Sequence, residues 1–393
     1  MSSSHSNHHH HHLNHLNHHP NTTNTSNHPL QKKRVRHVLG FRDPNIHARK
    51  SEFKWGSHLG SGTYGQVTQC TWLNQSPPRQ VAIKIVSKSL IPNSTRQISL
   101  LNRCLKLHHP HVCQLLDWFQ SKQHIYTIME LAQGGELFDH AISHGPFSDR
   151  DTAIMINQVI DAMAYIHQQS IVHRDLKPEN LFVRGQAPFK PPYDLVVADF
   201  GVAVYTNKPD GTHIPLNGIC GSPGYTAPEV YRGQLYSNAV DIWAIGIITF
   251  ILLSGRFPFS HLSGSDFLAE SEKPIKFPKR FGITPEAQNF ILACLQIDPS
   301  KRITAQDALD HPWLTKSKLV EDIVEQRTTT SLADTEYTRC ELPSKPHPDQ
   351  ENKIIEKLAS ITSQDPQDSD LADKLSPIQR TVSFQPENLE FID

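Results

Sequence analysis

The segment from His173 to Asn180 combines, within eight positions, side chains suited to moving a phosphoryl group. Asp175 can accept a proton, Lys177 can neutralise a phosphate, and Asn180 can hold a metal ion through its amide oxygen. The segment follows a long run with helical apolar periodicity and precedes a short apolar strand at 181–183, so it is predicted to be a loop. A loop with this much charge does not belong in the core, because unpaired buried charges are too costly. Phosphoryl transfer depends mainly on positioning and charge neutralisation, which these residues can provide.

The length and charge of the chain limit what surrounds this loop. The 393 residues are enough for one enzyme domain with tails, and the net charge of −1 gives no overall basic field. We therefore expect neither nucleic acid nor a membrane as a partner. No apolar segment follows a charged start, and the longest apolar run, Ile242 to Leu253, is shorter than the ~20 residues that a bilayer requires.

The cysteines indicate the compartment. The six cysteines are scattered without any CxxC spacing, which argues against a disulfide scaffold or a zinc module and favours a reducing compartment. A basic cluster at 32–36 is either a nuclear-import signal or an ordinary solvated charge run. The predicted location is therefore cytoplasmic, nuclear or both.

Composition divides the chain into three parts. Residues 1–50 are predicted to be a disordered His/Asn-rich tail that carries the basic cluster, because almost nothing apolar offsets its ordering entropy. Residues 51–314 are predicted to form the folded domain. Residues 315–393 turn polar, with scattered Pro, Ser and acidic residues, and are predicted to be mostly disordered.

A glycine-rich turn lies near the start of the predicted domain. The stretch from Phe53 to Ile85 has the pattern of strand, glycine turn, strand, linker and strand. Glycines let backbone N–H groups approach phosphate oxygens closely. A GxGxxG pattern alone also fits a dinucleotide site, but there the turn opens a helix, whereas Gln66 to Trp72 is rich in strand-forming residues. Lys84 ends the third strand and is either a phosphate-binding lysine or a surface lysine.

A second carboxylate comes after the charged loop. The apolar strand predicted at 195–198 leads into Asp199, Phe200 and Gly201. A carboxylate at a strand end followed by a glycine turn suits the binding of Mg²⁺, which prefers oxygen ligands.

Taken in order, these motifs resemble those of eukaryotic Ser/Thr protein kinases, and the resemblance covers about Phe53 to Leu314. The Gly134 to Phe138 stretch is similar to that of the calcium/calmodulin-dependent group, and Lys177-Pro178-Glu179 favours Ser/Thr over Tyr specificity. The resemblance implies an α+β fold with two lobes, a β-rich N-lobe and a mainly helical C-lobe. It also implies transfer of the ATP γ-phosphoryl group to Ser/Thr hydroxyls of protein substrates, with ATP and Mg²⁺ bound.

The resemblance assigns roles residue by residue. Asp175, Lys177 and Lys84 would be catalytic, and Asn180 and Asp199 would hold Mg²⁺. The residues expected to bind the nucleotide are Leu59, Gly60, Gly62, Gly65, Val67, Ala82, Lys84, Glu130, Ala132 and Glu136.

Two acidic side chains bear on the choice of substrate. Glu136 either lies near the ribose, where it can take a substrate arginine, or is simply an acid at a helix N-terminus. Together with Glu179 it would favour substrates with arginine before the acceptor. Calmodulin binding is not predicted, because a calmodulin target is a basic amphipathic helix and Leu319 to Gln326 is acidic.

Three structural contacts are also implied by the resemblance. Ser222 should touch Asp175 and Lys177. Asp241 should accept backbone hydrogen bonds from the charged loop, and Arg302 should pair with Glu229.

The sequence departs from the family pattern in two places. The helix predicted at Thr95 to Leu107 has no acidic residue, so Gln97 stands where the family has a glutamate that pairs with the lysine. A nucleotide-binding scaffold without catalysis is therefore the second hypothesis. Positions 216–219 have no hydroxyl where the family carries its activating phosphate, and we expect activity without that phosphate.

Overall fold

The computed structural model describes residues 46–62, 65–91, 93–185, 189–191, 193–207 and 212–316. The chain divides into two units, Met1–Phe41 and Arg42–Asp393, and every described residue belongs to the second. The basic cluster at 32–36 and the acidic stretch from Leu319 to Gln326 lie outside the described residues, so the interpretations that rest on them stay predictions.

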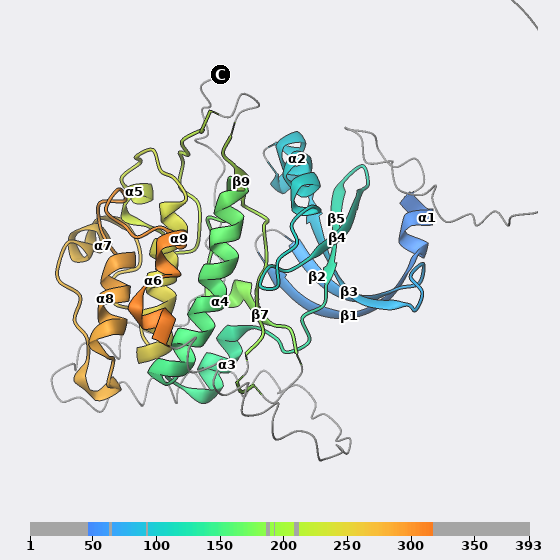
Figure 1. Cartoon of the computed structure of the whole chain (residues 1–393). Helices are drawn as coiled ribbons and strands as arrows, with labels where there is room; N and C mark the ends of the chain where they lie inside the picture. Colours follow the sequence, from blue (N-terminus) through green and yellow to red (C-terminus); the bar gives the residue numbers. More distant parts are fainter. Residues whose placement is uncertain are drawn as a thin grey trace, which may run out of the picture. The chain divides into compact units, whose positions relative to one another are not determined.

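The N-terminal part of the second unit is built on a five-stranded antiparallel sheet in the order β1-β2-β3-β5-β4 (Figure 1). The strands are β1 (Phe53–Gly62), β2 (Gly65–Trp72), β3 (Arg79–Ser87), β4 (Leu115–Gln120) and β5 (His124–Glu130). The predicted succession of strand, glycine turn and two further strands is thus confirmed. One face of the sheet buries a cluster that includes Phe53, Val81 and Phe119, which fixes the register of the strands.

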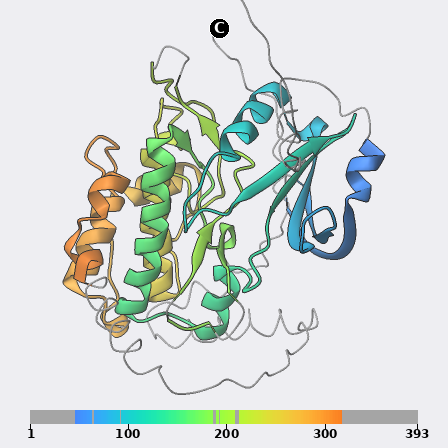
Figure 2. The ribbon, with the colours of Figure 1, turned by 45° about the vertical axis from the view of Figure 1, so that its right-hand side comes forward.

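Helix α2 (Ser94–Cys104) packs against this sheet, as Figure 2 shows. It begins where the Asn93 side chain accepts a hydrogen bond from the N–H of Arg96, and it buries Leu100, Leu101 and Cys104. The predicted helix is confirmed, but it ends at Cys104 rather than at Leu107.

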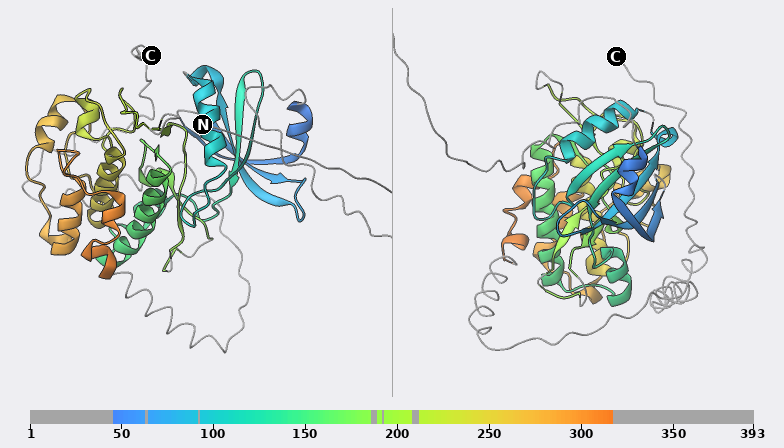
Figure 3. Two further views of the ribbon diagram at one scale, coloured as in Figure 1. Left: turned by 45° about the horizontal axis from the view of Figure 1, so that its top comes forward. Right: turned by 90° about the vertical axis from the view of Figure 1, so that its right-hand side faces the viewer.

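Helix α1 (Ile46–Ser51) lies inside the stretch for which the sequence predicts a disordered tail. It sits on the side of the sheet that faces away from the helical lobe (Figure 3). Arg49 explains why this helix forms and stays against the sheet, because its guanidinium pairs with Asp117 of β4 at 2.5 Å and with Glu52 at 2.7 Å. The last residues of the predicted tail are therefore helical.

The C-terminal part of this unit is mainly helical. Its helices are α3 (Leu137–His144), α4 (Asp149–Gln168), α5 (Pro228–Tyr231), α6 (Ala239–Ser254), α7 (Gly264–Ser271), α8 (Pro285–Cys294) and α9 (Ala305–Ala308), with a 3-10 turn η3 (Lys279–Phe281). The Ser148 hydroxyl accepts the N–H of Asp151 at 3.0 Å and begins α4, as predicted. Helix α6 is buried on nearly all sides, which agrees with its apolar sequence.

Two short antiparallel ribbons and a 3-10 turn (η2, Pro178–Asn180) lie between the sheet and the helices. The ribbons pair β6 (Ile171–Val172) with β9 (Val204–Tyr205), and β7 (Leu181–Val183) with β8 (Leu195–Val197). This arrangement confirms the expected two-lobed α+β fold. Within the described ranges, no helix combines the length and apolar character needed to cross a membrane.

Candidate active site

The charged loop is fixed to the core by one buried carboxylate. Asp241 of α6 is 1% exposed and accepts the backbone N–H groups of His173 at 2.9 Å and Arg174 at 2.8 Å. His167 of α4 lies 2.9 Å from the same carboxylate. Burial raises the pKa of Asp241, but the hydrogen bond and charge of His167 and the contacts with His173 outweigh it and lower the pKa overall. The predicted role of Asp241 is confirmed.

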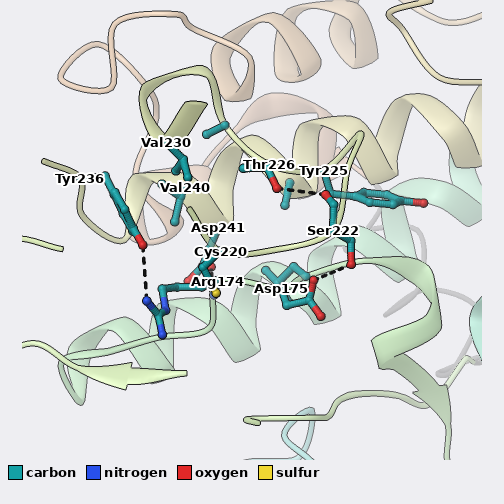
Figure 4. Close-up of a pocket in the computed structure, with 13 residues that line it drawn as sticks. Arg174, Asp175, Cys220, Ser222, Tyr225, Thr226, Val230, Tyr236, Val240 and Asp241 are labelled. Carbon is teal, nitrogen blue, oxygen red and sulfur yellow. Dashed lines mark hydrogen bonds between the residues drawn. The ribbon is translucent and has the colours of Figure 1, made fainter. Parts of the chain in front are cut away.

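Asp175 and Lys177 point toward the same hydroxyl. The Ser222 hydroxyl donates to Asp175 Oδ1 at 2.8 Å (Figure 4). It also accepts from Lys177 Nζ at 2.9 Å. The ammonium group also lies 3.8 Å from Asp175 Oδ2. The predicted contacts of Ser222 are confirmed. A carboxylate held beside an ammonium group in this way can orient a hydroxyl and accept its proton.

Asn180 connects this pair to the strand that carries Asp199. Its side-chain N–H donates to the backbone carbonyl of Asp175 at 2.7 Å. Its backbone carbonyl accepts a hydrogen bond from the N–H of Ala198 at 2.9 Å. Among the described residues, no hydrogen bond uses the amide oxygen of Asn180. The amide thus offers the oxygen, which is the atom that a hard cation takes.

Lys84 and Asp199 meet between the two lobes. Lys84 Nζ lies 2.5 Å from Asp199 Oδ1, and the two side chains are 11% and 32% exposed. Burial raises the pKa of Asp199, but Lys84 and the N–H of Gly201 outweigh this effect, so the pKa lies below its usual value. A Cβ on Gly201 would lie 2.9 Å from Asp199 Oδ1 and 3.3 Å from Lys84 Nζ, so a larger residue here would crowd this pair. The two sequence motifs, 115 residues apart, form one charged pair.

Gln97 does not take the place of the missing glutamate. Within the described part of the chain, no hydrogen bond joins Gln97 to Lys84, whose ammonium is bound to Asp199. Helix α2 has other contacts. Trp118 Nε1 donates to Asn102 at 3.1 Å, and the Arg103 guanidinium lies 3.4 Å from the ring centroid of Tyr205 in β9. Packing, and not the usual ion pair, holds this helix.

The glycine turn joins β1 to β2 as predicted, with Gly60 opposite Val67 and Gly62 opposite Gly65. Gly65 has φ +147°, and a Cβ there would lie 2.1 Å from the carbonyl oxygen of Ile85, so this position requires glycine. Around Gly60 and Gly62 a Cβ would meet nothing within 4 Å in the described structure. Their backbone therefore borders open space that a phosphate chain can enter. Thr63 and Tyr64, at the tip, lie outside the described residues.

The remaining positions expected to bind the nucleotide lie in the strands of the sheet or in the residues that follow β5. Ala82 is 6% exposed and pairs with Met129 of β5, one residue before Glu130. In the described ranges, the backbone N–H of Ala132 has no hydrogen-bond partner, so it is available to the edge of a purine base. Leu59 is 37% exposed in β1, directly before the glycine turn. Glu136 is the N-cap of α3, but its side chain makes no capping hydrogen bond.

Hydrogen bonds to Arg174 and Ser170 hold the described parts of the segment from Asp199 to Glu229. The Arg174 guanidinium donates to the carbonyl of Val202 at 2.8 Å and 2.5 Å, and to the Tyr236 hydroxyl at 3.4 Å. Thr206 is 1% exposed and its hydroxyl donates to the carbonyl of Ser170. Activity without the usual loop phosphate stays a prediction, to which these contacts give a physical basis.

A small cavity lies behind the charged loop, lined by residues that include Asp175, Cys220, Tyr225 and Asp241 (Figure 4). Its volume of about 10 Å³ matches roughly one water molecule, so it cannot hold a nucleotide. The residues expected to bind the nucleotide lie elsewhere, at Lys84, Asp199 and the glycine turn.

Glu229 and Arg302 form the predicted pair, with side chains 1% and 0% exposed and a distance of 2.7 Å. Sequence reasoning missed two other residues, His167 behind Asp241 and Arg184 behind Glu130. No local pattern marks either one, because their partners lie 74 and 54 residues away in the chain.

The comparisons with known proteins agree with this geometry. A family model described as protein kinase domain matches residues 53–314. A calcium/calmodulin-dependent protein kinase (cmkA) of Emericella nidulans is 40% identical over 275 residues, which cover 69% of this chain and 64% of that protein.

Two further relatives have similar identity. Calcium/calmodulin-dependent protein kinase type I of Schizosaccharomyces pombe is 38% identical, and the match covers 68% of this chain and 79% of that protein. Myosin light chain kinase A of Dictyostelium discoideum is 36% identical, with 72% and 97% covered. This chain thus spans less than two thirds of the Emericella relative but nearly all of the Dictyostelium one.

Proposed function

The chain belongs to the protein kinase family, and we propose that it is a Ser/Thr protein kinase of the calcium/calmodulin-dependent group that transfers the γ-phosphoryl group of ATP to protein hydroxyls. The observation that supports this most is a series of hydrogen bonds that links the predicted catalytic and metal-binding residues. Lys84 donates to Asp199, the N–H of the preceding residue, Ala198, donates to the Asn180 backbone, and Asn180 and Ser222 both donate to Asp175. The groups that phosphoryl transfer requires therefore lie around one space.

Each group has a task in this proposal. The backbone of the glycine turn covers the phosphates, and Lys84 binds them through its ammonium group. Asp175 takes the place beside the acceptor hydroxyl, orients it and accepts its proton. Lys177 lies next to that hydroxyl and stabilises the negative charge on the group in transfer.

Asn180 and Asp199 fit the ligand set of Mg²⁺. One carboxylate and one amide oxygen are hard donors of the kind that Mg²⁺ takes together with phosphate oxygens and water. When bound, Mg²⁺ neutralises charge on the phosphates. Asp199 is suited to this because its lowered pKa keeps it ionised.

The proposal can be tested with purified full-length chain, [γ-³²P]ATP, Mg²⁺ and a basic peptide with Ser, Thr or Tyr as the acceptor. We expect label on the Ser and Thr peptides and none on the Tyr peptide. A chain that binds ATP but labels none of the peptides would favour the scaffold function. The observation that supports this alternative is that, in the described residues, Gln97 makes no hydrogen bond with Lys84. Label on the Tyr peptide would contradict the proposed specificity.

We further propose that the kinase prefers arginine before the acceptor residue. The backbone of Glu136 pairs with Phe182, which places this carboxylate next to the loop. Burial raises the pKa of Tyr225, and the carboxylates of Glu179 and Asp175 raise it further, which places two acidic groups in the region around this ring. A guanidinium group suits such a region.

The preference predicts a measurable loss of selectivity. Glu136→Gln and Glu179→Gln should each lower kcat/KM for peptides with an upstream arginine by about 10–100-fold relative to peptides without it, since a charge-assisted hydrogen bond is lost. The measurement is kcat/KM for the matched peptides. Glu286→Gln, the same change in the first turn of α8, is the control and should leave the ratio unchanged. A library profile without arginine enrichment would contradict the preference.

Whether the chain binds calmodulin is a separate question. The names of the Emericella and Schizosaccharomyces relatives include dependence on it. The expectation that this chain does not bind calmodulin therefore has no support from the comparisons, and the stretch that suggested it lies outside the described residues.

A further inference from the structure

Arg184, the residue after β7, joins three segments of the chain. Its Nη1 donates to Asp194 Oδ1 at 2.8 Å, at the base of the hairpin that leads to β8. Its Nη2 donates to the carbonyl of Pro110 at 2.6 Å. Its Nε donates to Glu130 Oε2 at 3.2 Å, and its Nη2 lies 3.4 Å from Glu130 Oε1. Among these partners, Glu130 belongs to the segment where the adenine base is expected.

Arg184 and Gln114 together hold the Glu130 side chain. Its carboxylate is 13% exposed, and besides Arg184 it accepts the backbone N–H of Gln114 at 2.8 Å. Its own N–H donates to the carbonyl of Gln114 at 3.0 Å. Its side chain therefore fixes the last residue of β5, and with it the backbone carbonyl that is expected to accept a hydrogen bond from the base.

The backbone of Arg184 holds the other end of the same segment. The N–H of Gln133 donates to the carbonyl of Arg184 at 3.1 Å, and the N–H of Gly134 donates to Val183 at 2.9 Å. The approach is so close that a Cβ on Gly134 would lie 2.2 Å from the carbonyl oxygen of Gly185. Residues 130–134, which we call the hinge, are thus bound at one end by the Arg184 side chain and at the other by the backbone of Val183 and Arg184.

The charge of Arg184 is maintained in this place. Burial lowers its pKa, but the hydrogen bonds and charges of Glu130 and Asp194 outweigh burial and raise it. The ion pair with Glu130 is partly screened, since Arg184 is 31% exposed. Its geometric effect does not depend on that screening, because the planar guanidinium fixes three acceptors in direction as well as distance.

We propose that Arg184 is a positioning residue for adenine: it binds Glu130 and Gln133 and thereby holds the hinge backbone in the geometry that receives the base. The inference rests on the proposed function, since it assumes that adenine binds at Glu130 and Ala132. A binding site whose donors and acceptors are already ordered loses less conformational freedom when the ligand binds. Loss of this order therefore weakens the adenine contacts and leaves the phosphate contacts intact.

The test compares three variants of the full-length chain. Arg184→Met keeps the apolar stem of the side chain and removes the guanidinium. Glu130→Gln removes the negative charge with which the hinge binds Arg184. Asp194→Asn removes the negative charge with which the hairpin binds Arg184 and leaves the hinge contact in place. The measurements are the Kd of adenosine and of ATP by calorimetry, the KM for ATP and kcat, with thermal melting as the check on folding.

We expect Arg184→Met to raise the Kd of adenosine and of ATP by the same factor, roughly tenfold, because the change affects only the contacts with the adenine base. Its KM for ATP should rise while kcat at saturating ATP is retained. Glu130→Gln should act in the same direction. Asp194→Asn should bind adenosine as the wild type does.

Several results would overturn the inference. One is wild-type adenosine affinity in Arg184→Met. Another is weaker binding of ATP with adenosine unchanged, which would place the effect at the phosphates. Equal losses in all three variants, accompanied by a lower melting temperature, would reduce Arg184 to a structural role. A wild-type chain that binds neither ligand would overturn the proposed function itself, and the inference with it.

Discussion

Replacing Asp175 with alanine should lower kcat by about 10²–10⁴, the usual contribution of a positioned acid or base. Asp175 holds the Ser222 hydroxyl at 2.8 Å in the structure, and a substrate hydroxyl would need the same acceptor. Its carboxylate does not touch the Lys84–Asp199 pair, so the affinity for ATP should stay close to that of the wild type. Peptide kinetics and ATP calorimetry on the same preparation measure both quantities.

Glu272→Ala is a suitable control for this variant. Glu272 is 64% exposed in a surface pair with Arg232, and its removal should change neither kcat nor ATP affinity. An Asp175→Ala variant with kcat within about threefold of the wild type would exclude the assigned role of Asp175.

Replacing Glu229 with alanine should lower the free energy of unfolding by about 3–5 kcal/mol, because the charge of Arg302 would then be buried without its carboxylate. The pair is almost fully buried, and Arg302 also donates to the carbonyls of Gln296 and Ala239. These carbonyls cannot supply the missing negative charge. Urea unfolding of the purified variant measures the change.

Here too, Glu272→Ala provides the comparison. It removes a carboxylate from an arginine pair of similar length, 2.8 Å, but at the surface, and should change the free energy of unfolding by at most about 1 kcal/mol. If both variants lose a similar amount of unfolding free energy, burial does not explain the contribution of the Glu229–Arg302 pair to stability.

Much of the fold follows from local pattern. Strands around the glycine turn, the helix that begins at Ser148 and the apolar helix after Asn238 are each marked by periodicity or capping that acts over a few residues. The motif order then implied which distant residues meet. The contacts of Ser222 with Asp175, and of Asp241 with the charged loop, were predicted in this way and are confirmed.

What the sequence did not reveal depends on side chains from separate segments. The order of α1 comes from Arg49 reaching Asp117, which lies 68 residues further along the chain. The loss of the usual partner of Lys84 was visible at Gln97, but not that α2 is instead held by Arg103 against Tyr205. Such contacts have no spacing rule, because tertiary packing decides them.

The central claim is that Lys84, Asp175, Asn180 and Asp199 serve one nucleotide with its Mg²⁺. The most direct test is the Kd of ATP with and without Mg²⁺, for the wild type and for Asp199→Asn, with adenosine as the reference ligand. We predict that Mg²⁺ strengthens ATP binding in the wild type, that this gain falls by about tenfold or more in Asp199→Asn, and that adenosine affinity is the same in both. If Asp199→Asn keeps the full Mg²⁺ effect, the four residues do not form one site.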